Sequence, residues 1–108
     1  KFTATTLPRE IQSAPVYAIT SIPDKSGTPL LVFGGNQSRI KPELGSQMGS
    51  YGWVLKSDGN NQWKTLLPAE SGLFVPGEIR DFLPITIENK PNLVVLRNND
   101  TPLVFEIR

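Results

Sequence analysis

The chain has 108 residues and carries 11 lysines and arginines against 10 aspartates and glutamates, a formal net charge of +1. This length predicts at most one domain, and the near balance of charge argues against a nucleic-acid partner or an anionic membrane. The absence of cysteine and histidine excludes disulfides, cysteine-based zinc sites and the usual general base at neutral pH. No apolar run approaches the length of a membrane-spanning helix, so we expect no membrane insertion within this chain.

The composition is typical of an all-β protein. Nine glycines and ten prolines are spread through the sequence, and both residues interrupt helices and mark turns. Valine, isoleucine, threonine and the aromatic residues gather in short runs between them, as they do in strands.

Four strands are predicted in the first half of the chain. Residues 2–6 are rich in strand formers and end at Leu7 and Pro8. Residues 16–22 follow, and then the apolar run at residues 30–33, which we expect to be covered on both faces because no polar residue alternates with the apolar ones. A long polar loop over residues 34–50 leads into the fourth strand, residues 51–56.

The second half repeats this order. Residues 62–66 pair back across an Asp58-Gly59 turn, which is a strong hairpin signal. Strands are then predicted at residues 78–83, 93–97 and 103–107, with short turns between them.

The two halves match at a shift of 63 residues. Val16 meets Ile79, Ile19 meets Phe82, and the run at residues 30–36 meets residues 93–99 without a gap. The sequence therefore predicts one all-β domain of two antiparallel, four-stranded, propeller-like blades in the strand order d-a-b-c-d-a-b-c. The two repeat units span about residues 1–57 and 58–108.

Two blades cannot close a propeller ring, which typically needs four or more. Sheet edges and apolar side chains such as Phe33, Trp53 and Phe105 would then be bare. We expect them to pack on other propeller blades or, by self-association, on another copy of the chain.

Several short stretches carry a resemblance to a known family. They are Leu7-Pro8, residues 12–19, Gly35-Asn36, residues 50–55, Asp58-Gly59, Ser71-Gly72, residues 77–81 and residues 97–100. In this order they resemble the FG-GAP (or VCBS) repeats, the β-propeller superfamily of the integrin α-subunit head, and most of all the last blades of large Bacteroidetes-like bacterial repeat proteins. The resemblance implies a fragment of a larger β-propeller located extracellularly, at the cell surface or in the periplasm.

The same resemblance implies a calcium loop between the first two strands of each blade. Calcium needs six to eight oxygen ligands, but the matching stretch offers only Asp24 and Ser26, and the second copy keeps only Glu88 and Asn89. We therefore interpret the stretch as a degenerate loop that forms a plain turn, and predict no metal and no other cofactor.

The best candidate for a ligand site is the loop at residues 34–50, because long loops in small domains are often binding loops. In a propeller this loop would share one face with the turn that follows residue 97. A polar ligand such as a sugar, or a protein, would then meet a set of polar side chains beside one tyrosine: Asn36, Arg39, Lys41, Glu43, Gln47, Tyr51, Arg97, Asn99 and Asp100. A solvated loop, or one that packs on a neighbour, is the alternative.

The leading functional hypothesis is a non-catalytic scaffold or protein-interaction module. A carbohydrate-binding module that uses the 34–50 loop is the alternative, and a glycan hydrolase is less favoured because no spacing singles out a carboxylate pair. We interpret the charged residues near position 80 as ion pairs, either Glu78 with Arg80 or Asp81 with Arg97, rather than as a catalytic cluster.

Overall fold

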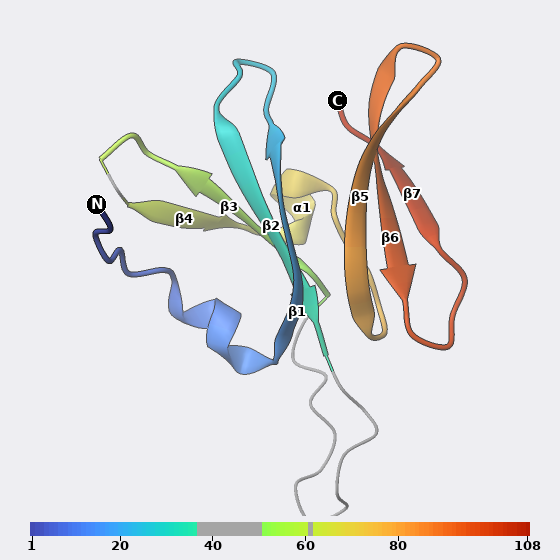
Figure 1. The fold of residues 1–108 in the computed structure, drawn as a ribbon, viewed down its shortest axis with the longest axis horizontal. Helices are drawn as coiled ribbons and strands as arrows, with labels where there is room; N and C mark the ends of the chain where they lie inside the picture. Colours follow the sequence, from blue (N-terminus) through green and yellow to red (C-terminus); the bar gives the residue numbers. More distant parts are fainter. Residues whose placement is uncertain (37–50, 61) are drawn as a thin grey trace, which may run out of the picture.

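The chain folds into two antiparallel β-sheets that lie beside one another (Figure 1). A computed structural model describes residues 1–36, 51–60 and 62–108. The first sheet has the order β1-β2-β3-β4, made of β1 (Val16–Pro23), β2 (Pro29–Gly35), β3 (Trp53–Ser57) and β4 (Trp63–Leu66). The second has the order β5-β6-β7, made of β5 (Ile79–Ile87), β6 (Lys90–Arg97) and β7 (Leu103–Glu106). Two short helices, η1 (Arg9–Ser13) and α1 (Pro68–Ser71), precede β1 and β5. The predicted all-β class is confirmed.

The prediction of a strand at residues 2–6 is wrong. The four strands predicted in the second unit are present, but the strand at residues 62–66 (β4) pairs with β3 in the first sheet, so the second of the two predicted blades has three strands and not four. Residues 2–6 belong to no strand and are exposed, Phe2 completely so. A strand needs a neighbour to satisfy its backbone groups, and among the described residues no strand pairs with this segment. The second sheet accordingly has three strands where the first has four.

The two sheets share a backbone feature at matching positions. Each first strand carries a β-bulge next to its start, between Val16 and Ala18 in β1 and between Ile79 and Asp81 in β5. These bulges lie at the predicted shift of 63 residues. A bulge is a specific backbone feature, so its recurrence at matching positions supports the repeat.

The shift is not constant, however, which corrects the gapless match predicted from the sequence. Ile19 pairs with Phe33 in the first sheet, whereas Phe82 pairs with Val95 in the second. Val95 is therefore the structural equivalent of Phe33, at a shift of 62. The second hairpin turn is one residue shorter because Glu88 and Asn89 both adopt positive φ, at 50° and 64°, as a tight two-residue turn requires.

The sheets meet through faces that are not equivalent. Ala18, Val32 and Val54 of the first sheet are buried in one cluster with Phe82 and Val95 of the second. The residue in the first unit that corresponds to Phe82 is Ile19, which neighbours Ala18 and points to the opposite face. Successive units are therefore stacked in one direction and are not related by a two-fold axis.

The outer face of the first sheet is largely covered by the chain itself. Phe33, Trp53 and Leu55 are buried there together with Ala14, and Ile11 of η1 packs against them. Burial of Val32 on one face and Phe33 on the other confirms that this strand is covered on both sides. The expectation that Phe33 and Trp53 would be bare is wrong, because the segment before β1 covers them.

The outer face of the second sheet is apolar and open. Leu83, Leu96 and Val104 form it, and their exposed fractions are 52%, 39% and 56%. Leu83 and Val104 both lie opposite Val94 in the strand registers, so they line the same face across three strands. Val94 is the equivalent of Val32, which is 1% exposed. The face that the first sheet buries is thus exposed in the second.

Candidate functional site

A buried polar network joins the two units at the ends of β2, β5 and β6. Asn36 is 1% exposed, and its amide Nδ2 donates to the carbonyl oxygen of Gly77 at 2.8 Å. The backbone carbonyl of Asn36 accepts from Arg80 Nη1 at 3.0 Å. Glu78 Oε2 accepts from Arg80 Nη2 at 3.1 Å and from Asn98 Nδ2 at 2.8 Å. The network places Asn36 as a structural link between the units.

The ion pair predicted between Glu78 and Arg80 is confirmed. The guanidinium carbon of Arg80 also lies 4.2 Å from the centre of the Tyr17 ring, a cation–π contact that ties β5 to β1. These side chains are therefore already occupied by contacts within the protein.

Loss of the Glu78 charge is expected to lower the free energy of unfolding by about 1.5–3 kcal/mol, the usual contribution of hydrogen bonds to a charged group. The test is urea denaturation of Glu78→Gln beside Glu88→Gln, which removes the same charge from an exposed turn. The control should stay within about 0.5 kcal/mol of the parent chain. Equal effects of the two substitutions would contradict the role given to the network.

Arg97 forms different contacts from those predicted. Its Nε and Nη2 donate to the carbonyl oxygen of Thr101 at 3.0 and 2.7 Å, and its Nη1 donates to that of Pro76 at 3.2 Å. Asp100, not Asp81, is its ion-pair partner, at 3.0 Å. Asp81 instead accepts from the N–H of Phe82 at the bulge, at 2.9 Å. The Arg97 side chain is only 6% exposed, so a ligand would have to displace these bonds.

The connector at residues 73–77 brings several predicted site residues together. Asn36 and Arg97 bond to its carbonyl groups, as described above, and the carbonyl oxygen of Tyr51 accepts from the N–H of Val75 at 2.8 Å. The Tyr51 ring stacks on Phe74 with the ring centres 4.4 Å apart and the planes 17° apart. Both rings are about half exposed. Phe74 was not predicted from the sequence.

The remaining predicted site residues divide into two groups. Asn99 has a positive φ of 56° in the turn after β6, and Asp100 is half exposed beside Arg97. The other four lie outside the described residues: Arg39, Lys41, Glu43 and Gln47.

Asp24 organises the turn between β1 and β2. Its Oδ1 accepts from the N–H of Ser26, the hydroxyl of Ser26 and the N–H of Thr28, at 2.9, 2.7 and 2.9 Å. Lys56 Nζ lies 3.5 Å from the other carboxylate oxygen. Asp24 and Ser26, which the sequence analysis interpreted as a degenerate calcium loop, thus bond to each other in a turn. The described residues contain no group of three or more acidic side chains placed to hold a metal ion.

The hydroxyl of Ser26, helped by the backbone N–H groups of Thr28 and Ser26 and by Lys56, holds the pKa of Asp24 below its ordinary value of 3.8. A lowered folded-state pKa means that the stabilisation is present above the unfolded pKa and is lost as the pH falls through the folded one. Asp24→Asn should therefore be less stable than the parent chain at pH 7, and the gap should close below pH 3.8. Urea denaturation at several pH values measures it, and a gap that is independent of pH would contradict this account.

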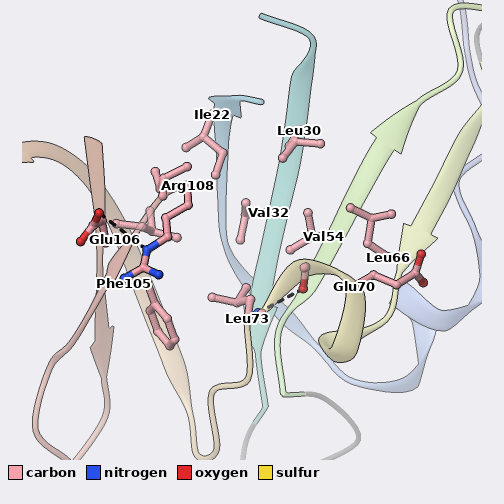
Figure 2. Close-up of a pocket in the computed structure, with 14 residues that line it drawn as sticks. Ile22, Leu30, Val32, Val54, Leu66, Glu70, Leu73, Phe105, Glu106 and Arg108 are labelled. Carbon is pink, nitrogen blue, oxygen red and sulfur yellow. Dashed lines mark hydrogen bonds and ion pairs between the residues drawn. The ribbon is translucent and has the colours of Figure 1, made fainter. Parts of the chain in front are cut away.

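A pocket of about 500 Å³ lies between the two sheets beside β7 (Figure 2). Its lining is mainly apolar and includes Leu66 of β4, Leu73 of the connector, and Phe105 and Ile107 at the end of the chain. Figure 2 shows charged side chains around it, with Glu106 and Arg108 on one side and Glu70 on the other.

The sequence matches no protein-family model, and neither a curated protein nor a solved structure matches the chain. Within the part of the chain that the structure describes, no helix has the length and apolar character to cross a membrane.

Proposed function

We propose that the chain is a non-catalytic scaffold module of an FG-GAP-like repeat protein, a propeller fragment that binds other protein surfaces through its sheet faces. The observation that carries the proposal is the one-directional stacking of the two units. Because of this stacking, the second sheet exposes the face that is equivalent to the buried inner face of the first sheet.

The open face has the character of an interface. Leu83, Leu96 and Val104 lie together on three adjacent strands, each between about two-fifths and three-fifths exposed. Soluble monomers rarely leave contiguous apolar patches uncovered, and larger ones commonly mark protein contacts. The natural partner for this face is a sheet surface like the one that covers Val32.

The resemblance to FG-GAP repeats supports two further parts of the proposal. One is that additional blades, or further copies, complete a propeller-like array. The other is a location outside the cytoplasm, extracellular, at the cell surface or in the periplasm.

Sedimentation velocity over a hundredfold range of protein concentration tests the proposal. We expect the weight-average sedimentation coefficient to rise with concentration, and Val104→Glu to suppress the rise because it places a charge in the open face. Gln62→Glu, which adds the same charge in the exposed β3–β4 turn, is the control and should associate like the parent chain. A monomer at every concentration, or equal behaviour of the two variants, would overturn the proposal.

Glycan binding is the second candidate, and the half-exposed stack of Tyr51 on Phe74 favours it. Aromatic rings present flat apolar surfaces with a polar edge, which suit sugar rings. Chemical shift changes in a titration with a panel of oligosaccharides should map to these two residues and disappear in Tyr51→Ala. Shift changes that persist in that variant would exclude this site.

A further inference from the structure

In the part of the chain that the structure describes, no strand pairs with the edge of β7 that faces away from β6. The strand registers make β5, β6 and β7 the equivalents of β1, β2 and β3, and the first sheet carries β4 beside β3. The N–H of Ile107 donates to the carbonyl oxygen of Pro91, on the β6 side, at 2.9 Å. Because backbone groups alternate along a strand, the N–H groups of Val104 and Glu106 point to the side where no described strand lies.

The pocket described above lies beside β7. Phe105 of β7 and Ile107, just after it, line the pocket. Leu66 of β4 lines its opposite side from Phe105 (Figure 2). A strand paired with β7 would place every second side chain on the face that carries Phe105, next to the pocket. A single added β-strand would therefore both pair with the edge of β7 and cover the apolar pocket.

The segment at residues 2–6 has the place in the repeat that β4 has. Leu67 and Pro68 follow β4 and lead through α1 to β5, and Leu7 and Pro8 lead in the same way through η1 to β1. The segment is rich in threonine, a strand-forming residue, and is exposed. By its position in the repeat, the segment corresponds to β4, but it does not pair with any described strand.

Within the same copy, no described strand pairs with residues 2–6. Ile11 and Ala14, just after the segment, pack on Trp53 and Leu55, on the face of the first sheet turned away from the second. Figure 1 shows the N-terminus on the far side of the first sheet from β7. β4 comes just before β5 in the chain, but it pairs into the preceding sheet, not into the sheet of β5. If residues 2–6 follow the same rule, they pair into a sheet that precedes the sheet of β1.

We propose that residues 2–6 of one copy add to the free edge of β7 in a second copy. They become the fourth strand of its β5–β6–β7 sheet, and the outer face of that sheet packs on the first sheet of the donor. The main-chain hydrogen bonds of the added strand provide the affinity, as in other cases of strand addition. This inference rests on the proposed function, for which it names the partner.

Site-directed cross-linking tests the contact, because the chain has no cysteine of its own. Thr5→Cys chains are mixed with Glu106→Cys chains and treated with a short bismaleimide. The control mixture replaces the second variant with Lys64→Cys, an exposed position on β4. We expect roughly tenfold more mixed dimer than in the control, since a preformed contact raises the effective concentration of the two thiols. Equal yields would overturn the proposal.

A second measurement probes the edge itself. Glu106→Pro removes an outward N–H group from β7 and should weaken self-association in sedimentation by about tenfold. Glu106→Ala removes the same carboxylate but keeps the N–H group, and should associate like the parent chain. Unchanged association of the proline variant would overturn the proposal.

The outcomes separate the two proposals. If the chain associates and Val104→Glu prevents it, but neither the cross-link nor the proline effect is seen, strand donation is wrong and the scaffold function stands. If the chain stays monomeric throughout, both are wrong. If a Thr5→Cys/Glu106→Cys double variant cross-links within a monomer, the occupant is the chain's own segment and the second copy is excluded.

Discussion

Replacing Phe82 with alanine is expected to lower the free energy of unfolding by about 3–5 kcal/mol, the usual cost of removing a buried aromatic ring. Phe82 is 6% exposed and lies in the cluster between the two sheets. Its ring lies directly over the backbone of the first sheet, because a methyl group added at Gly34 would come within 2.8 Å of its Cζ. Urea denaturation followed by tryptophan fluorescence measures the change.

The repeat supplies a matched control for this substitution. Ile19 holds the equivalent position in the first unit but is 61% exposed. Ile19→Ala should change the stability by no more than about 0.5 kcal/mol, as is usual for surface positions. If both substitutions had the same cost, the two faces would be used in the same way and one-directional stacking would be wrong.

Gly35→Ala is expected to destabilise the protein by about 3 kcal/mol or more, at the upper end of overpacking effects. Gly35 lies opposite Val16 at the bulge, and an added methyl group would overlap the carbonyl oxygen of Pro15. The obstacle is backbone, which cannot turn away as a side chain can. The start of β1 would have to separate from β2, next to the Asn36 network.

Gly59→Ala separates this clash from the general effect of losing a glycine. Gly59 has a φ of 88° and nothing within 4 Å of an added methyl group, so its cost should be only about 1–2 kcal/mol from the left-handed backbone. Urea denaturation of both variants measures the two losses of stability. A smaller loss for Gly35→Ala than for Gly59→Ala would contradict the close approach of Pro15.

Much of the fold could be predicted because its signals are local. The Asp58-Gly59 turn and the apolar run at residues 30–33 identify strands that the structure contains. The segment at residues 2–6 has the same local signals but pairs with no strand among the described residues. Whether it forms a strand therefore depends on tertiary contacts, which local sequence does not encode. The register of β6 depended on one residue fewer in a turn, which periodicity alone does not detect.

The candidate site was harder to predict than the fold. Arg97 and Asn36 have the chemistry of ligand-binding residues, yet the side chains of both are buried and bonded to the connector at residues 73–77. The sequence could not predict these hydrogen bonds, because they join residues far apart in the chain. Phe74 could not be predicted as a site residue for the same reason. An aromatic residue in a predicted connector was its only signal, and its stacking on Tyr51 depends on the packing of the two units.

One NMR measurement tests the central claim, the stacking of the two units through non-equivalent faces, most directly. In a nuclear Overhauser spectrum of the chain at low concentration, the ring protons of Phe82 should show cross-peaks to the α protons of Gly34. Leu83 and Leu96, on the open face, should show none to the first sheet. Cross-peaks from Leu83 or Leu96 to the first sheet, with none from Phe82 to Gly34, would contradict the account.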